Sequence, residues 1–528
     1  MDRAEQVRKV LATRGLTLYR VSQQSAEIYG CPSPFFVPHS LYSDANQHSL
    51  IPTLAQMIAL SRITNYLLYD WLAVFGVDLD QIPRLQSTVP RKRTALLDSS
   101  VYDTSAWVPW FSGRPQVDAV PAIAPLGQLL SEAAPRRARE LVPADKGRFL
   151  YGKVGEEDVH AFPHLAVGSI FRVDTKRPEE HLCDARESPG RRLFLVEHVS
   201  GYTCSRLVLR AKDRIVLHSP QNSCVETELR LGKEARIIGV VDAEIRPVWE
   251  RSLPRPPQRS AIWQRPRLPF PPSPQPSLSA LLRNSRLRLG VSFREASSTS
   301  RWIASTLSDE LYFAAPGTLS DYETLSSPPR HIQKIITLCV LYCIDFRGFL
   351  RACGLPFDQE RREPIPDELV PRRAPNRSPG PHNPGGQEVR QETGGFLDSL
   401  LNNWEEVPLF LRGSLKELAG PRAFSLLDVF WVGGAKPALH PLLVNAALVV
   451  VNRRMKRPDP STAKTIRGPS LYLLLTRASN YICGCCTLEE GKLVVRDYAG
   501  ASHGTQRFRN GIEAEVIGRV TTILRRLL

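Results

Sequence analysis

Two patterns of hydrophobic and polar positions alternate along the chain. In "LAQMIALSRI" (54–63) and "IQKIITLCVLY" (332–342), apolar residues recur at i, i+3, i+4 and i+7, which predicts amphipathic helices. In "RLFLVEH" (192–198) and "SLYLLLT" (470–476), short apolar runs lie between turn residues, which predicts strands. The patterns therefore predict a multidomain α + all-β protein. Its helical domains are expected at 1–88 and 278–358, and its strand-rich domains at 148–250 and 397–528.

Three polar or proline-rich stretches separate these domains. Residues 89–147 and 359–396 are expected to be spacers, and the second is expected to be disordered because it is rich in Pro, Gly and polar residues. Residues 251–277 are a linker with nine prolines, and residues 251–288 carry eight arginines and no acidic residue. This composition is typical of a stiff, solvated spacer, and it also fits an arm that contacts DNA phosphates.

The sequence repeats itself at a nearly constant offset. "GLTLYRVSQQS" from Gly15 resembles "GVSFREASSTS" from Gly290. Four further blocks match at almost the same offset, including "SGYTCSRL" with "SNYICGCC", and "ARIIGVV" around Gly239 with "AEVIGRV" around Gly518. The constancy of this offset predicts an internal tandem duplication of a unit of roughly 250 residues. The Pro/Arg-rich linker would then lie between the two copies.

Charge and cysteine content limit the class of protein. The chain has 69 Lys and Arg against 53 Asp and Glu, a net charge of +16, which favours a polyanionic partner because bound Lys and Arg release counterions from phosphates. Its 10 cysteines do not form the framework of a small secreted domain. The N-terminus lacks a signal-peptide core, and no uninterrupted apolar run approaches the length that spans a bilayer. We therefore expect a cytoplasmic protein without a membrane segment.

The second helical domain contains a helix-turn-helix pattern. Ser292 and Glu295 form an S-x-x-E capping pattern, which predicts a helix through "FREASSTSRWIA". A second, short helix is expected to begin near Gly317 or Thr318, with Leu319 packed inward. The pattern "TLSDYE…PP…I..I..L" resembles the Cro/CI-type (XRE) helix-turn-helix family over about 65 residues of each half. This resemblance implies a recognition helix whose N-terminal residues enter the major groove of DNA.

The first helical domain departs from that pattern. Thr17 can cap its helix, but Arg20 stands where a capping Glu is expected, and "PHSLYSDANQHS" replaces the recognition helix. A different interpretation is that both helical domains are ordinary bundles used for dimerisation. The resemblance implies DNA-contacting candidates in both halves. They are Thr17, Tyr19, Arg20, His39, Ser40, Tyr42 and Ser43, and Ser292, Arg294, Thr318, Ser320, Asp321 and Tyr322.

The strand-rich domains carry a second resemblance. "EDVHAFPHLAVGSIFRVD" (157–174) and "IIGVVDAEIRP" (237–247) resemble parts of the LexA/phage-repressor autoprotease fold, an all-β domain shared with signal peptidases. In that family a Ser is the nucleophile and a Lys on a later strand is its base. The fold class that the two resemblances imply is two all-α helix-turn-helix domains alternating with two all-β LexA-like domains.

Neither half retains the residues of that dyad. The Ser is expected eight or nine residues before a turn such as Gly168, where the first half has His160 or Val159, and the Lys position holds Ser205. In the second half the two positions hold Lys436 or Pro437, and Gly484. We therefore expect degenerate, non-proteolytic domains that serve dimerisation or sensing.

Other candidate chemistry is sparse. On a strand, Cys483 and Cys485 share one face and Cys486 lies on the other, which favours buried thiols over a metal or redox site. Four histidines of the first strand-rich domain lack a zinc spacing such as H-E-x-x-H. They are His160, His164, His198 and His218. We expect no catalytic residue, no metal ion and no cofactor.

These observations predict a sequence-specific, repressor-like DNA-binding transcriptional regulator that is not an enzyme. Its β-domains are expected to pair within the chain as a covalent pseudo-dimer on double-stranded DNA, and two chains could assemble further. Two alternatives are open. One is a serine peptidase in which Ser169 or Ser205 acts in a non-standard dyad, and the other is an interaction scaffold that does not bind DNA.

Overall fold

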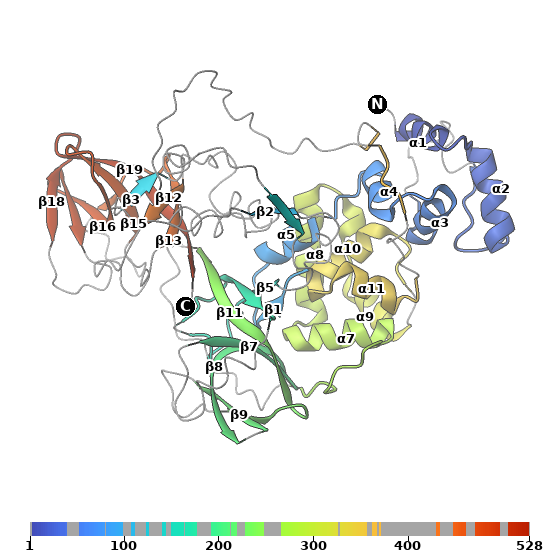
Figure 1. Cartoon of the computed structure of the whole chain (residues 1–528), viewed down its shortest axis with the longest axis horizontal. Helices are drawn as coiled ribbons and strands as arrows, with labels where there is room; N and C mark the ends of the chain where they lie inside the picture. The colour runs from blue at the N-terminus through green and yellow to red at the C-terminus, as the bar shows by residue number, and fades with distance from the viewer. Residues whose placement is uncertain are drawn as a thin grey trace. The chain divides into compact units, whose positions relative to one another are not determined.

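A computed structural model of the chain separates helices and strands into two compact units (Figure 1). The helical unit contains residues 1–86, 274–287 and 291–388, and the strand unit contains residues 87–273, 288–290 and 389–528. The fold is therefore mixed, with helices and a large antiparallel sheet. The described residues are 3–39, 52–79, 81–98, 107–110, 123–125, 140–143, 149–162, 164–176, 192–211, 213–218, 227–247, 266–325, 328–355, 362–366, 369–370, 429–432, 447–460, 470–496 and 505–526.

The described helices form two successive sets. The first set is α1 (Arg3–Ala12), α2 (Leu18–Tyr29), α3 (Leu54–Thr64), α4 (Leu68–Val74) and α5 (Gln81–Thr88). The second set is α7 (Leu278–Leu289), α8 (Phe293–Leu307), the 3-10 helix η7 (Glu310–Tyr312), α9 (Pro316–Thr324), α10 (Ile332–Tyr342) and α11 (Phe346–Ala352). The helix predicted after Ser292 and the short helix predicted near Gly317 are both confirmed. Within the described residues, none of the helices has the length and apolar character needed to cross a bilayer.

The two sets begin and end helices in the same way at matched positions. Thr17 caps α2 and Ser292 caps α8, and each side-chain oxygen accepts a hydrogen bond from the amide three residues later at 3.3 Å. Asn65 follows α3 and Cys343 follows α10, and both adopt left-handed conformations with φ of 57° and 49°. Both pairs are positions that the sequence repeat aligns with each other.

The strand unit contains two groups of antiparallel strands with the same order. The first group runs β1 (Ala95–Leu96), β5 (Phe149–Lys153), β6 (Ile170–Asp174), β11 (Ala235–Pro247), β7 (Leu193–His198), β8 (Gly201–Ala211), β9 (Arg214–His218) and β10 (Thr227–Arg230). The second runs β3 (Ile123–Pro125), β12 (Val429–Val432), β13 (Ala447–Asn452), β19 (Ala514–Arg526), β15 (Leu471–Thr476), β16 (Tyr481–Glu489), β17 (Lys492–Arg496) and β18 (Gln506–Arg509). A short β14 (Asp459–Pro460) lies parallel to β16, and β2 (Trp107–Trp110) pairs with β4 (Glu140–Pro143).

The register of the two groups also matches. β11 has irregularities at Ile238 and Asp242, and β19 has them at the equivalent positions of the repeat, Ile517 and Thr521. Such bulges bend a strand at a fixed place. In each strand, a glycine is required next to the first of the two bulges. In β11, a Cβ at Gly239 would lie 2.3 Å from the Asp174 carbonyl oxygen. A Cβ at Gly518 would lie 2.5 Å from the Asn452 carbonyl oxygen.

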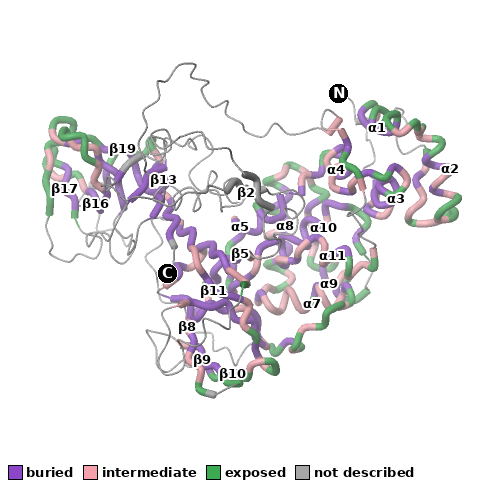
Figure 2. The backbone as a smooth tube through the Cα atoms, in the orientation of Figure 1, coloured by how far each residue is buried: buried purple, intermediate pink, exposed green. Residues whose placement is uncertain are grey.

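Each group buries a core on both faces of its sheet. In the second group, one face buries Val449, Leu473 and Cys483 among others, and the opposite face buries Leu474 and Cys486. The first group has two corresponding clusters. Figure 2 shows buried positions running along β11 and β13, whereas the outer parts of α1 and α2 are largely exposed. The hydrophobic effect of these alternating faces is what fixes strand register.

The last strands of the two groups pair with each other. In the antiparallel ladder of β11 and β19, Ile245 lies opposite Leu524, Ala243 opposite Arg526, and Pro247 opposite Thr522. Ile245 and Leu524 are themselves equivalent positions of the repeat. The pairing therefore has a local two-fold arrangement, in which each strand presents the same positions to the other.

The stretches that we expected to be spacers have different outcomes. Residues 89–147 contribute the four short strands β1 to β4. Most of residues 359–396, and residues 251–265 of the linker, lie outside the described residues.

Candidate functional site

The first candidate site is the pair of helices α8 and α9. Ser292 and the Glu295 side chain form the predicted capping box at the start of α8. Helix α8 ends at Ser308, which adopts a left-handed conformation with φ of 54°. The chain then forms η7 before α9 begins at Pro316, a residue that favours the first turn of a helix. The turn between the two helices is therefore longer than a simple tight turn.

A buried serine fixes the start of α9 against α8. Ser300 Oγ accepts a hydrogen bond from Ala314 N at 3.0 Å and donates to the Ser297 carbonyl oxygen at 2.8 Å. Leu319 is 0% exposed and packs inward, as predicted. From α7, the Arg286 guanidinium forms a two-pronged ion pair with Glu323 at 2.7 and 3.0 Å. These contacts hold α9 in one orientation.

The same serine contact is present in the first helical set. Ser25 Oγ accepts from Val37 N at 3.0 Å and donates to the Ser22 carbonyl oxygen at 2.8 Å. Ser25 and Ser300 are equivalent positions of the repeat. We did not predict this pair, although a serine at the same place in two repeated helices was a usable signal.

The six candidates of the second half divide by exposure and by role. Arg294 and Asp321 are exposed, and Thr318, Ser320 and Tyr322 are partly buried. Ser292 is exposed, but its hydroxyl is engaged by Glu295, so its main contribution is to begin α8. Burial, and then the charge of Asp321, raise the pKa of Tyr322, which keeps its hydroxyl protonated.

The positive charge of this region comes from α8. Helix α9 contains no Lys or Arg, and it exposes Asp321. Arg294 and Arg301 are exposed on α8, and the Arg301 guanidinium lies 4.0 Å from the centroid of the Phe313 ring. A polyanion would therefore be attracted to α8, whereas α9 offers mainly neutral and acidic polar groups.

The DNA-contacting candidates of the first half that the structure describes are all exposed. Thr17 caps α2, and Tyr19 and Arg20 are exposed in its first turn, with Tyr19 at 70%. His39 is exposed and lies two residues after Val37, whose amide donates to Ser25. Ser40, Tyr42 and Ser43 lie outside the described residues.

The two serines of the peptidase alternative are buried and bonded to backbone. Ser169 is 0% exposed, and its hydroxyl donates to the Ala166 carbonyl oxygen at 2.6 Å. The Ser205 hydroxyl donates to the Arg206 carbonyl oxygen at 2.7 Å. A nucleophilic serine needs a base that accepts its proton, and within the described residues each of these protons is directed at a carbonyl oxygen instead.

The other positions of the dyad differ between the two halves. His160 is buried, and Gly484 has no side chain to offer. Lys436 and Pro437 lie outside the described residues.

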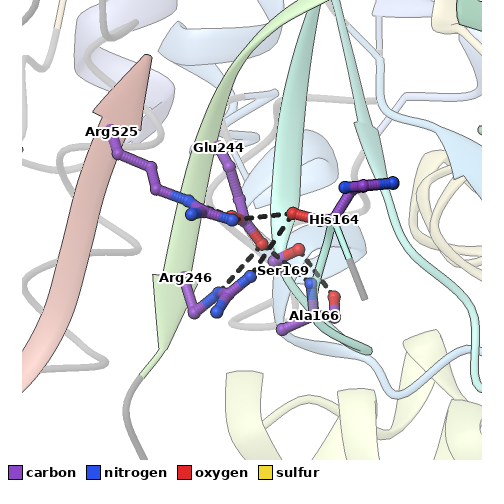
Figure 3. Close-up of polar contacts among 6 residues, drawn as sticks. All are labelled: His164, Ala166, Ser169, Glu244, Arg246 and Arg525. Atoms are coloured by element: carbon purple, nitrogen blue, oxygen red, sulfur yellow. Dashed lines mark hydrogen bonds and ion pairs between the residues drawn. The ribbon is translucent and has the colours of Figure 1, made fainter. Parts of the chain in front are cut away.

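A buried polar site of the strand unit lies where β11 meets β19 (Figure 3). The Glu244 carboxylate accepts hydrogen bonds from Arg525 Nε at 2.8 Å, Arg246 Nε at 3.1 Å and Ala166 N at 2.8 Å. Arg525 also donates to the His164 carbonyl oxygen at 2.7 Å, and Arg246 to the same oxygen at 3.4 Å. The Glu244 carboxylate thus accepts hydrogen bonds from two arginines that lie on two different strands.

The electrostatics of this site keep Glu244 ionised and His164 neutral. Burial alone would raise the pKa of Glu244, but Arg246, Arg525 and the Ala166 amide together lower it below its usual value. Burial, and then the positive charges of Arg206 and Arg525, lower the pKa of His164 to about 4. The cluster therefore carries one negative and two positive charges at neutral pH.

The cluster follows the repeat only in part. Arg246 and Arg525 are equivalent positions of the repeat and occupy equivalent places on β11 and β19. The residue equivalent to Glu244 is Ile523, which is buried and apolar. Sequence reasoning missed this cluster because its residues come from two strands that are far apart in the chain.

The cysteines lie as predicted. Cys483 and Cys485 belong to one buried cluster of the second strand group and Cys486 to the cluster on the opposite face. Burial raises the pKa of Cys486 to about 12, so its thiol is protonated and unreactive at neutral pH. In the described part of the chain, no three His, Cys, Asp or Glu side chains gather in a way that could hold a metal ion.

No protein-family model, curated protein or solved structure matches this chain.

Proposed function

We propose that the chain is a sequence-specific DNA-binding transcriptional regulator in which two halves of one chain replace the two subunits of a dimer. The observation that carries the proposal is the capped helix α8 followed by α9, fixed to it through Ser300 and Leu319. This order corresponds to a scaffold helix and a recognition helix. The basic character of the chain, with a net charge of +16, supports a phosphate-bearing partner.

In this proposal the two halves arose by tandem duplication. The matched bulges of β11 and β19 and the paired contacts of Ser25 and Ser300 support it, because irregular features rarely recur by chance at one offset. The pairing of β11 with β19 about Ile245 and Leu524 supports a covalent pseudo-dimer. The strand-rich domains would then serve dimerisation or sensing within a cytoplasmic regulator.

The proposed DNA contacts are divided between α8 and α9. Arg294 and Arg301 are suited to phosphates, since both are exposed and basic. Thr318, Ser320 and Asp321, in the first two turns of α9, present short polar groups of the kind that read base edges. The two halves have diverged in sequence, so the DNA site is expected to be asymmetric.

The proposal includes no catalysis. A serine peptidase would need Ser169 or Ser205 as a nucleophile, and both hydroxyls are buried and donate to backbone carbonyl oxygens. Activation of either serine would require its hydroxyl to give up this hydrogen bond.

Selection of sequences from a random duplex pool by the full chain, at two salt concentrations, tests the proposal. We expect a bipartite, asymmetric motif. Arg294→Gln should lower the slope of log affinity against log salt by about 1, which is the effect of losing one phosphate contact. Arg507→Gln removes the same charge from an exposed position of β18 and is the matched control. Enrichment of no sequence, or equal effects of both variants, would contradict DNA binding through α8.

A non-DNA-binding interaction scaffold is the second candidate function. It is favoured by the exposed apolar side chains of α2, where Tyr19 is 70% and Ile28 60% exposed. The acidic α9 also favours it. Salt-insensitive or absent binding to DNA, in the experiment above, would support this function instead.

A further inference from the structure

The outer strand of the second strand group, β3, comes from the first half of the chain. β3 pairs with β12 in antiparallel register, with Ile123 opposite Val432, Ala124 opposite Trp431 and Pro125 opposite Phe430. In Figure 1 the cyan β3 lies among the red strands of residues 429–526. The two paired strands thus come from opposite halves of the sequence.

The same position in the first group is filled by a local strand. β1 pairs with β5, with Ala95 opposite Lys153 and Leu96 opposite Gly152. Lys153 is equivalent to Trp431, because their strands pair with β6 and β13 in the same register. Ala124 on β3 therefore occupies the place of Ala95 on β1.

The contacts that the described residues make differ between the two outer strands. Next to β1, Glu156 N donates to the Arg91 carbonyl oxygen at 2.9 Å and Glu157 N to the Lys92 carbonyl oxygen at 2.7 Å. Thr94 Oγ1 accepts from Gly155 N at 3.1 Å. These contacts anchor β1 along a continuous stretch. For β3, the described residues provide a ladder of three residue pairs and one anchor, the side chain of Ile123.

The anchor lies in an apolar site of the second strand group. Ile123 is 5% exposed and belongs to the cluster that includes Phe430, Val432, Val449 and Cys483. The rest of that cluster comes from residues 429–523 of the second strand group. Main-chain pairing at a sheet edge, with one side chain in a pocket, is how extended peptides are recognised by β-strand addition. Proline also fits such a strand, because it is tolerated on sheet edges.

We propose that the outer edge of β12 is a docking site for an extended peptide that carries a branched apolar side chain, and that residues 123–125 occupy it as an intramolecular ligand. The site would open to a partner peptide when this segment is displaced. Covalent attachment raises the effective concentration of the segment, so the intact chain keeps the site closed despite the short ladder. This inference does not depend on DNA binding.

A labelled peptide of residues 118–129 tests the proposal with the full chain. In Ile123→Asp the buried anchor becomes charged, which should vacate the edge of β12. We expect fluorescence polarisation to show at least about tenfold tighter binding of the peptide to this variant than to the unmodified chain, because the intramolecular competitor is lost. Ile512→Asp, at an exposed position after β18, is the matched control and should bind like the unmodified chain. A peptide with Asp in place of Ile123 should not bind.

Hydrogen exchange of residues 429–432 is a second readout, which reports whether the edge of β12 is open without relying on the affinity of the peptide. In Ile123→Asp these amides should exchange faster, and the added peptide should slow them again. Unchanged exchange in the variant would overturn the proposal, as would equal binding of the peptide to both chains. If Ile123→Asp fails to fold, Ile123→Ala keeps the test, with a smaller increase of peptide binding expected for the same reason.

Discussion

Replacement of Glu244 by Gln should release the pairing of β11 with β19. The carboxylate is fully buried and is shared by Arg246 and Arg525, whose side chains are 8% and 9% exposed. Gln keeps the shape of the side chain but removes the charge that balances two buried guanidinium groups. Breaking a buried ion pair by removing one partner costs about 3–5 kcal/mol. The strand pair should be destabilised by an amount in that range.

Hydrogen exchange of residues 243–246 and 522–526 measures this change directly. Since about 1.4 kcal/mol corresponds to a factor of ten, the amides should exchange more than about 100-fold faster in Glu244→Gln. The control is Glu228→Gln, which breaks the exposed ion pair with Arg214 and should change stability by about 1 kcal/mol or less. Equal and small effects of both variants would refute the view that the buried cluster holds the strands together.

A triple variant separates the charge from the packing. If Glu244, Arg246 and Arg525 are all replaced by apolar residues of similar volume, no buried charge is left unbalanced. Such replacements are often neutral or stabilising. We therefore expect the triple variant, Glu244→Leu with Arg246→Met and Arg525→Met, to protect the strand amides better than Glu244→Gln does, although the Ala166 amide and the His164 carbonyl lose their partners. Protection as weak as in Glu244→Gln would show that the ion pairs themselves are needed.

The same carboxylate gives the strand pair a dependence on pH. The pKa of Glu244 is lower in the folded chain than its ordinary value near 4.3, so its stabilisation is fully present above that ordinary value. It is lost as the pH falls through the lowered, folded-state pKa. In an acid titration, the protection of the strand amides, which is the intrinsic exchange rate at each pH divided by the measured rate, should therefore fall at low pH in the unmodified chain, and should depend less on pH in Glu244→Gln.

Two further predictions concern the repeated contacts. Ser300→Ala leaves the buried Ala314 amide without its acceptor and should destabilise the α8–α9 region by about 1–3 kcal/mol, measured by hydrogen exchange, whereas Ser305→Ala on the exposed face should have little effect. Gly518→Ala places a Cβ against backbone and should destabilise the strand unit by about 1–3 kcal/mol in urea unfolding, whereas Gly317→Ala meets no atom within 4 Å and should be neutral or stabilising by up to about 1 kcal/mol. A stable Gly518→Ala chain would contradict the close approach of the strands.

Local signals in the sequence predicted local structure well. The capping box of Ser292 and Glu295 predicted the start of α8, because both partners of that contact lie within one turn. The inward position of Leu319 and the opposite faces of Cys485 and Cys486 followed from helical and strand periodicity. These contacts depend on residues close together in the chain.

Contacts between distant segments had no such signal. Three residues of β3 are too few to show a period, so residues 89–147 read as a spacer although Ile123 is buried in the core of the second strand group. The partners Glu244 and Arg525 lie in opposite halves of the sequence, and either alone reads as an ordinary surface charge. The roles of the candidate DNA-binding residues also depend on a partner that the sequence does not contain.

The shared carboxylate of Glu244 decides which strands can pair. If β19 paired with β19 of a second chain in the same register, Ile523 would face Arg525 twice, and no carboxylate would balance the two buried arginines. If β11 paired with β11, Glu244 would face Arg246 twice. Exchange between chains would thus create one balanced junction and one that is strongly disfavoured. The two halves are therefore complementary and not interchangeable, and in a solution of many such chains each first half should pair with a second half and not with another first half.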